Sequence, residues 1–346
     1  MTAIRGDELP PAYPIGVPAT DSRPAWTGEP ESLIVTADTG DRLHYLDWGG
    51  PEPSGPEPPP PGPPPLLLIH GLAQTGWVWA PVARRLRSVT RVLAADLRGH
   101  GLSDSPRTGF ELESLAFDAL TVLAGNGWGR EVEGPAAAVC GHGLGAMIAA
   151  TMAAIQPDSI CAVALVDGGW EDVGEATGLT AAEFERGLGD PPEVLASMDA
   201  FLADRREFDP PSWDADQERA ARATVEQKHA GHVAPVTRGF ALRGCIDAMF
   251  GYQPLDVLGR VSQPLLVAVA DSASADDEGQ RERLLALDDV VRRRRELGLA
   301  APAVERFAAA GHNLMRYRPA ELSAALERLL KDAAALTSAH RRGGPA

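Results

Sequence analysis

Short apolar runs alternate with helical patterns along the first half of the chain, and this alternation limits the possible folds more than any other feature. The alternating runs lie at 66–69, 78–86, 91–95, 112–123, 136–140, 144–156 and 160–166. The first of them, 66–69, is wholly apolar, as expected of a parallel strand buried on both faces. Two earlier runs within 32–48 flank Asp38-Thr39-Gly40-Asp41 and predict a hairpin. We therefore expect an α/β fold with a mostly parallel, twisted sheet flanked by helices.

The alternation stops near residue 170, and only helical patterns follow until about residue 260. Those patterns lie at 181–188, 192–205, 214–229 and 234–250. Strand-like runs then return at 265–270 and 304–307, and a last amphipathic helix is expected at 319–331. Such an insertion is longer than an ordinary connection, and ligand pockets favour the junctions that it creates. We expect a helical cap at 170–260 on a core formed by 31–169 and 261–336.

Proline is concentrated near the N-terminus, where 16 of the 30 prolines fall in the first 65 residues. Residues 1–30 show little periodicity and are expected to form a disordered tail. Residues 51–65 hold 10 prolines and predict an extended surface loop. The last ten residues, 337–346, are expected to be frayed.

Composition excludes several classes of partner. The net charge is −16, from 48 acidic and 32 basic residues, which disfavours nucleic acid, because phosphate binding needs clustered cations. No apolar run approaches the roughly 18 residues of a membrane-spanning helix. The three cysteines are far apart and residues 1–14 have no apolar signal region, so we expect a cytoplasmic protein. No metal-ligand spacing is visible, and we expect neither metal nor cofactor, with a small molecule as the partner. The oligomeric state stays open.

Four segments that carry chemistry follow the predicted strands. They are His70-Gly71-Leu72, the run 96–104 (DLRGHGLSD), the run 139–146 (VCGHGLGA) and Gly311-His312-Asn313. Their order and spacing, together with the inserted cap, resemble the α/β-hydrolase-fold family of lidded esterases, haloperoxidases and dehalogenases over about residues 31–336. The resemblance implies an α/β-hydrolase fold with a helical cap, and a sharp strand-to-helix turn, G-x-S-x-G, that carries the nucleophile.

This chain departs from that turn motif at its central residue. The segment is Gly141-His142-Gly143-Leu144-Gly145, so the nucleophile position holds Gly143, which has no side chain to attack a substrate. Cys140 lies within the strand and His142 precedes the apex of the turn, so neither replaces the nucleophile. Glycine tolerates the backbone angles of such a turn. The sequence does not distinguish a natural replacement from an engineered one.

The resemblance also implies roles for residues outside the turn. His312 matches the catalytic histidine, and the backbone N–H groups of Leu72 and Leu144 match the oxyanion hole. Asp271 is our choice for the acid that orients the histidine, because it directly follows the strand at 265–270. The alternatives, Asp276, Asp277 and Asp167, stay open.

Three readings of the function follow. The first is a hydrolase that acts on a small ester-like substrate by weak or water-mediated hydrolysis, with His312 as the base. The alternatives are a non-catalytic protein that binds a small ligand, and a lyase that uses His312 as its base. Near the strand ends and in the cap, the candidate substrate-binding residues are Trp77, Trp170 and Phe250.

Overall fold

The structure is a computed structural model that describes residues 28–51, 62–271 and 278–342. The expectations for the N-terminal tail up to residue 27 and for the proline-rich loop at 52–61 lie outside these residues. Asp276 and Asp277 lie outside them as well.

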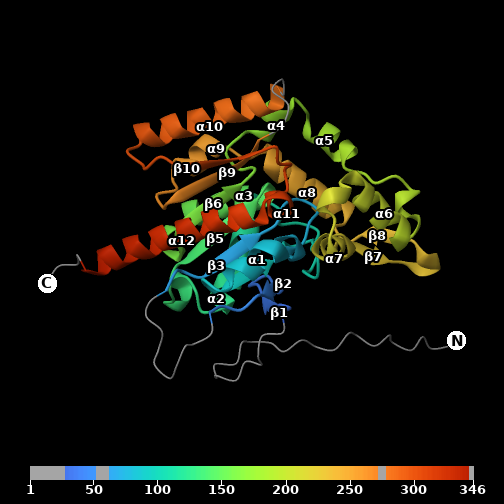
Figure 1. Cartoon of the computed structure of the whole chain (residues 1–346), viewed down its shortest axis with the longest axis horizontal. Helices are drawn as coiled ribbons and strands as arrows, with labels where there is room; N and C mark the ends of the chain where they lie inside the picture. The colour runs from blue at the N-terminus through green and yellow to red at the C-terminus, as the bar shows by residue number, and fades with distance from the viewer. Residues whose placement is uncertain (1–27, 52–61, 272–277, 343–346) are drawn as a thin grey trace.

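Eight strands form one sheet in the order β1-β2-β4-β3-β5-β6-β9-β10 (Figure 1). Their bounds are β1 Glu31–Thr36, β2 Arg42–Asp47, β3 Leu66–Ile69, β4 Val92–Ala95, β5 Ala137–His142, β6 Ile160–Val166, β9 Leu265–Asp271 and β10 Ala303–Ala308. The first two strands pair antiparallel as the predicted hairpin, and β2 pairs antiparallel with β4. The remaining pairs of this sheet, from β4 to β3, β5, β6, β9 and β10, are parallel. The predicted mostly parallel sheet is confirmed.

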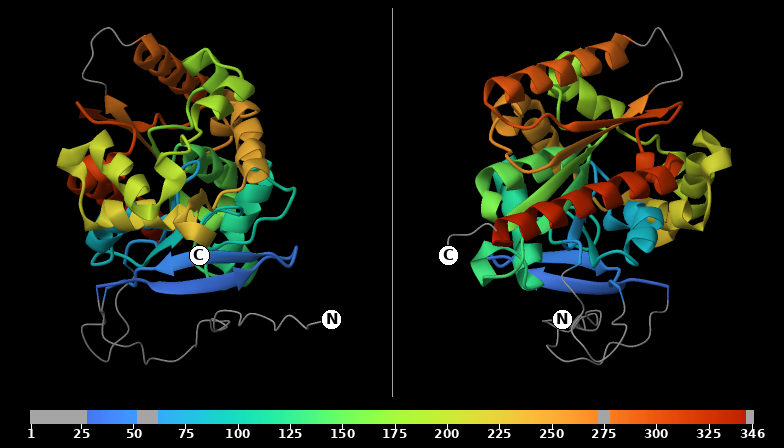
Figure 2. Two further views of the ribbon diagram at one scale, coloured as in Figure 1. Left: turned by 90° about the vertical axis from the view of Figure 1, so that its right-hand side faces the viewer. Right: turned by 60° about the vertical axis from the view of Figure 1, so that its left-hand side comes forward.

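Helices cover both faces of the sheet, which explains why its central strands are apolar throughout. One face packs on α1 (Ala80–Leu86) and α12 (Pro319–Arg342), and the other packs on α2 (Leu112–Gly125), α3 (Leu144–Ile155) and α10 (Glu278–Glu296) (Figure 2). Within β3, Leu67 and Ile69 join the core under α2 and α3, whereas Leu66 and Leu68 join the core under α1 and α12. The sheet is thus packed between two hydrophobic cores, one on each of its faces.

Between β6 and β9 the chain leaves the sheet. It forms α4 Val173–Thr177, α5 Ala181–Gly187, α6 Met198–Phe208, α7 Ala215–Ala223, β7 Val225–Gln227, β8 Val233–Pro235, α8 Gly239–Phe250 and α9 Pro254–Leu258. The expectation of helices alone is wrong for β7 and β8, which form a two-stranded antiparallel sheet. Val225 and Val233 from these strands bury against Phe201 of α6, and that small core explains why the chain turns back here instead of continuing α7. Arg84 of α1 pairs with Asp216 of α7 and attaches this lobe to the sheet domain.

Short helices complete the chain. They are the 3-10 turns η1 Gly76–Trp79, η2 Arg130–Val132, η3 Pro157–Ser159, η4 Val194–Ala196, η5 Pro210–Ser212 and η6 His229–Gly231, and the α-helical turn α11 Leu314–Tyr317. Helix α12 continues to Arg342, eleven residues beyond the end expected from sequence. Apolar side chains of this helix are buried at helical spacing and anchor it on the sheet; they are Leu322, Ala325, Leu326, Leu329, Leu330 and Ala333.

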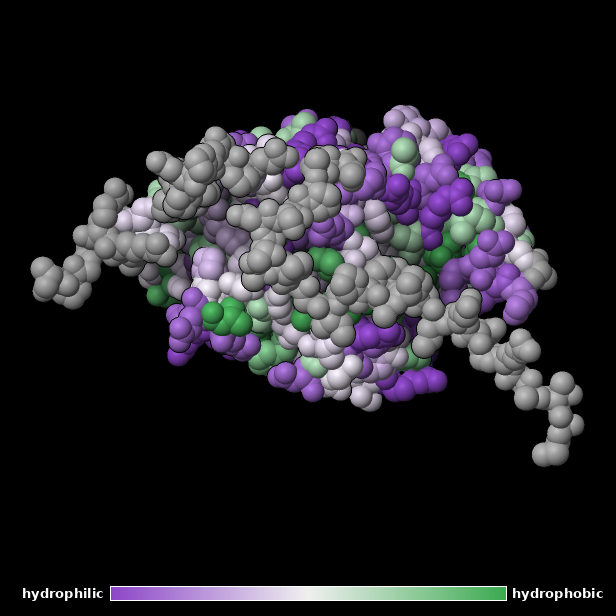
Figure 3. Space-filling view, turned by 90° about the horizontal axis from the view of Figure 1, so that it is seen from below, coloured by the Kyte–Doolittle hydropathy of each residue, from purple (hydrophilic) through white to green (hydrophobic). Residues whose placement is uncertain are grey.

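The surface carries both hydrophilic and apolar residues. On the face in Figure 3 the apolar residues lie in separate patches among hydrophilic ones. No helix within the described ranges is long and apolar enough to cross a membrane.

Candidate active site

The turn between β5 and α3 has the backbone of a nucleophile elbow. Gly143 lies at its apex with φ +53° and ψ −116°, a left-handed conformation that strains any residue with a side chain. Its two flanking glycines are required by close contacts. A Cβ on Gly141 would lie 1.9 Å from the Gly145 carbonyl oxygen, and one on Gly145 would lie 2.3 Å from that of Ile69. The turn is therefore built like an elbow, but it presents no nucleophile.

His312 lies beside the apex of this turn, in the loop between β10 and α11. A Cβ on Gly143 would lie 3.5 Å from His312 Nε2, in ordinary van der Waals contact. The other ring nitrogen, Nδ1, is 2.6 Å from Asp167 Oδ2. The His312 side chain is 57% exposed, whereas that of Asp167 is only 2% exposed. The histidine is thus held by a buried carboxylate while the ring itself stays open to solvent.

The expectation that Asp271 orients the histidine is wrong in this structure. Both oxygens of Asp271 lie 2.9 Å from Arg306 Nη2. Asp271 and Asp167 end two neighbouring parallel strands, β9 and β6, so both carboxylates reach the same edge of the sheet. Asp271 is turned toward β10, where Arg306 neutralises it, and Asp167 occupies the place beside His312.

The Asp167 carboxylate is held by three groups. Its Oδ2 faces His312, and its Oδ1 accepts hydrogen bonds from the backbone N–H of Ala270 and from Arg283 Nη2, both at 2.9 Å. Burial would raise the pKa of Asp167, but the hydrogen bond from His312, the charge of Arg283 and the Ala270 amide together lower that pKa below its usual value. Its φ of +46° is unusual for a residue other than glycine, so its backbone is strained as well. The carboxylate is therefore ionised and fixed.

The two backbone N–H groups predicted to form an oxyanion hole follow two strand ends. Leu72 lies in the loop after β3, and Leu144 is the first residue of α3, where helical N–H groups have no partner within the helix. Within the described ranges, no hydrogen bond uses the backbone N–H of either residue. Both N–H groups are thus without a hydrogen-bond partner among the described residues.

A polar network that the sequence analysis missed joins this loop to the histidine. Gln74 Oε1 accepts a hydrogen bond from Gly71 N–H at 3.0 Å, and Gln74 Nε2 donates to Asn313 Oδ1 at 2.7 Å. The buried ring of His142 packs 4.3 Å from the ring of His312, measured between centroids. Burial and the nearby His312 hold the pKa of His142 well below its usual value. The network fixes the loop after β3 relative to the residue that follows His312.

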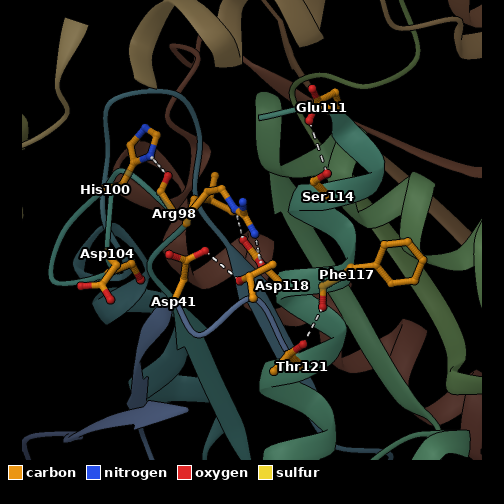
Figure 4. A network of polar contacts seen from close by, with 12 residues as sticks. Asp41, Arg98, His100, Asp104, Glu111, Ser114, Phe117, Asp118 and Thr121 are labelled. Carbon is orange, nitrogen blue, oxygen red and sulfur yellow. Dashed lines mark hydrogen bonds and ion pairs between the residues drawn. The ribbon is translucent and has the colours of Figure 1, made fainter. Parts of the chain in front are cut away.

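Two other histidines of the motif segments have structural roles. His70 Nε2 accepts the Leu97 N–H and its Nδ1 faces the Gly71 carbonyl, so the neutral ring ties two loops together. His100 donates to the Arg98 carbonyl, beside the ion pair of Arg98 with Asp118 (Figure 4). Burial, assisted by His70, lowers the pKa of His100 to about 3. These rings support the loops and are not available as bases.

The three aromatic candidates lie in different surroundings. Trp170 is wholly buried and its Nε1–H donates to the Arg283 carbonyl at 3.1 Å, so the expectation that it contacts substrate is wrong. Trp77 is half-buried, edge-on to Trp48. Phe250 is half-buried against Phe184. Trp77 and Phe250 stay predicted substrate-binding residues.

A pocket of about 440 Å³ flanks the histidine and its carboxylate. Its lining consists of Asp167, Ala270, Gln280, Arg283, Ala309, Ala310, Gly311 and His312. None of the expected aromatic residues belongs to this lining. Across the described part of the chain, no three His, Cys, Asp or Glu side chains are grouped so that they could hold a metal ion.

Comparison with known proteins identifies the family of the chain. A model of the "Alpha/beta hydrolase family" matches residues 66–325. The chain is 31% identical over 178 residues to 2-(acetamidomethylene)succinate hydrolase of Mesorhizobium japonicum, a match that covers 51% of this chain and 60% of that protein. It is 29% identical over 163 residues to epoxide hydrolase 4 of Homo sapiens, covering 45% of this chain and 41% of that one. The chain thus matches about half of the length of these two curated relatives.

Solved structures show the same fold. The crystal structure of E-2-(acetamidomethylene)succinate hydrolase superposes with a TM-score of 0.67 at 23% identity and covers 87% of this chain and all of the other. A thioesterase domain from the curacin biosynthetic pathway superposes with a TM-score of 0.59 at 20% identity, over 87% of this chain. The family match spans residues 66–325, which is more than half of the chain. The chain therefore belongs to the alpha/beta hydrolase family.

Proposed function

We propose that this protein hydrolyses a small ester-like substrate by direct attack of water, without a covalent acyl-enzyme. The observation that carries the proposal is the pair His312–Asp167 beside an elbow without a side chain. Nε2 of His312 faces the position that a nucleophile would occupy, and Nδ1 is held by a buried carboxylate. This arrangement retains the base and its orienting acid and leaves space for water where the serine hydroxyl would be.

The proposed reaction uses these groups in two steps. His312 Nε2 takes a proton from water as the water oxygen attacks the carbonyl carbon, and the amides of Leu72 and Leu144 stabilise the resulting oxyanion. The tetrahedral intermediate then expels the alcohol, which receives the proton from His312, and a carboxylic acid is left. General-base catalysis by histidine contributes about 10²- to 10⁴-fold. Turnover should therefore be slow and should favour substrates with good leaving groups.

The surrounding chain supports the same proposal. Residues 170–260 would act as a cap, because their helices lie outside the sheet and ion pairs such as Arg84–Asp216 attach them beside η1 and α1. The protein would work in the cytoplasm, because its three cysteines are all unpaired, as is usual in a reducing compartment.

The test is hydrolysis of a panel of activated short-chain esters by the native protein and by His312→Ala. We expect the native rate to exceed background and the variant to lose about 10²- to 10⁴-fold of that excess. His229→Ala is the matched control, because His229 is exposed and lies in the inserted segment. Equal rates in the native protein and in His312→Ala would exclude a histidine–water mechanism for these esters.

Gly143→Ser tests whether the rest of the site is intact. A serine hydroxyl at this position would lie within reach of His312 Nε2, because the intervening Cβ would be 3.5 Å from that nitrogen. We expect the variant to gain activity and to show a burst of product from an acyl-enzyme, which the native protein lacks. A variant that folds but shows neither burst nor gain would mean that the site no longer supports acyl transfer.

The missing side chain at residue 143 also favours a second candidate, a protein that binds a small ligand without turnover. Binding of the same esters, followed by tryptophan fluorescence, distinguishes the two. Saturable binding without hydrolysis in the native protein would support the binding protein over the hydrolase.

A further inference from the structure

A cation on a distant helix reaches the carboxylate that holds His312. Arg283 lies in α10, and its Nη2 is 2.9 Å from Asp167 Oδ1, the oxygen that does not face the histidine. The ion pair is buried, with side chains that are 18% and 2% exposed. The two carboxylate oxygens are thus divided between the histidine on one side and Arg283 with the Ala270 amide on the other.

Arg283 is itself fixed from several directions. Its Nε donates to Glu171 Oε1 at 3.0 Å, and its guanidinium lies over the Trp170 ring, 4.9 Å from the ring centroid. The Trp170 indole N–H donates back to the Arg283 carbonyl. Glu171 Oε2 in turn accepts the Trp170 backbone N–H at 3.1 Å. The loop after β6 and helix α10 therefore form a closed set of contacts around the acid.

We infer that Arg283 is a positioning residue for catalysis, one that holds Asp167 in the orientation in which its Oδ2 stays on His312 Nδ1. This inference rests on the proposed hydrolase function. Arg283 acts through Asp167 and not on the substrate. A planar guanidinium held on two carboxylates constrains direction as well as charge, which a lysine ammonium does less well.

The charges around Asp167 give the expected pH dependence. The titratable and charged groups that face it are His312, Arg283 and His142, and Glu171 lies behind Arg283. Without Arg283 the carboxylate loses a favourable charge while it stays buried, so the pKa of Asp167 should rise. Activity needs the ionised carboxylate, and the acid limb of the pH–rate profile should move to higher pH.

The neighbouring pair of Asp271 with Arg306 supplies a matched control. It is also an aspartate–arginine pair at the end of a strand, but the Arg306 side chain is 51% exposed and the pair does not contact His312. Arg283→Ala and Arg306→Ala therefore each remove a guanidinium group from an aspartate at the carboxyl end of a strand. Only the first should affect the histidine.

The kinetic test compares these two variants on an activated ester. We expect Arg283→Ala to lower kcat about 10- to 100-fold with little change in KM, as is common when a supporting residue is removed, and to show the shifted acid limb. Arg306→Ala should behave as the native protein. Guanidinium ion at millimolar concentration should restore part of the rate to Arg283→Ala, because the pocket beside Arg283 gives it access. Sodium chloride at equal ionic strength should not.

A second readout does not depend on turnover. The proton on His312 Nδ1 should give a downfield NMR resonance in the native protein, identified by its loss in His312→Ala. We expect this resonance to broaden or move in Arg283→Ala and to be unchanged in Arg306→Ala. If the native protein hydrolyses no ester, the proposed function fails, and this resonance alone decides whether Arg283 positions the pair.

The inference is overturned if Arg283→Ala retains both the native kcat and the native resonance. It is also overturned if a rate loss comes without the pH shift and without guanidinium rescue, because that pattern fits a merely structural role. Should Arg283→Ala fail to fold, Arg283→Lys replaces it. That variant keeps the charge but not the paired hydrogen bonds, and should lose less activity than the alanine variant while still disturbing the resonance. A native rate and resonance in Arg283→Lys would contradict the inference.

Discussion

Two histidine–aspartate pairs in this molecule have nearly the same hydrogen bond and different surroundings. His312 Nδ1 lies 2.6 Å from Asp167, and His44 Nδ1 lies 2.7 Å from Asp96. The His44 pair even has a serine on its other side, with Ser32 Oγ 2.7 Å from His44 Nε2. A hydrogen-bonded series of serine, histidine and aspartate is therefore complete at Ser32, His44 and Asp96. At the elbow the series lacks the serine, because Gly143 stands beside His312 and Asp167.

Access separates the two pairs. The His44 side chain is 2% exposed and that of His312 is 57% exposed. Asp96 also accepts the backbone N–H groups of Gly76 and Leu102, so its carboxylate organises the loops after β3 and β4. Hydrogen-bond geometry alone does not make a catalytic site. A site also needs an open ring nitrogen and free donors for the developing charge.

The largest expected effect that separates the pairs is on the rate. Asp167→Asn should reduce ester hydrolysis to the level of His312→Ala, a loss of about 10²- to 10⁴-fold, because the amide neither stabilises a charged imidazole nor fixes its tautomer. The measurement is kcat/KM on an activated ester. Asp271→Asn, the matched change at the acid expected from sequence, should leave the rate unchanged. A larger loss from Asp271→Asn would reverse the assignment.

The next effect is on stability. In the native protein His44 and two backbone N–H groups bond to the Asp96 carboxylate. Asp96→Asn places an amide NH₂ group against these donors and should lower the free energy of unfolding by about 3 kcal/mol. Burial would raise the pKa of Asp96, but His44 and backbone N–H groups lower it below its usual value. Its contribution is therefore present above about pH 4 and lost as the pH falls through the folded value. Urea unfolding at several pH values measures this, and the difference from the native protein should shrink in acid.

The control for that prediction is Asp104→Asn. Asp104 pairs with Arg42 at the surface, where ion pairs contribute about 0–1 kcal/mol. If both variants lost the same stability, the buried pair would have no special structural role.

The smallest effect concerns the serine of the buried pair. Ser32→Ala should cost about 1 kcal/mol of stability, the worth of one hydrogen bond, and leave the rate of hydrolysis unchanged. A fluorophosphonate reagent should fail to modify Ser32 in the native protein, as mass spectrometry would show. Modification at Ser32 would show that the His44–Asp96 pair is as accessible and reactive as the His312–Asp167 pair, which would contradict this comparison.

Much of the fold was predictable because buried positions of helices and strands are apolar and recur at regular spacing in the sequence. The run Leu66–Ile69 is apolar because helices cover both sides of β3, and the predicted strand matches its bounds. Gly143 and His312 could be expected to lie near each other because each follows a strand end, where the loops of such a sheet converge.

The acid and its support were not predictable in the same way. Asp167 and Asp271 each end one of two neighbouring parallel strands, and only the direction of each side chain decides which one reaches His312. Arg283 lies 116 residues from Asp167 in the chain and carries no local signal. The buried core around Trp170 was likewise invisible, because an aromatic residue near a strand end suits a pocket and a core equally well.

The glycine at the elbow also has a consequence for what the chain can tolerate elsewhere. A side chain at the φ and ψ of Gly143 would cost about 1–3 kcal/mol, against about 0.5–1 kcal/mol for the extra freedom of glycine in the unfolded chain. Native proteins have only about 5–15 kcal/mol of stability in total. Glycine at position 143 therefore leaves the chain a margin of stability that can absorb a moderately destabilising substitution at another position.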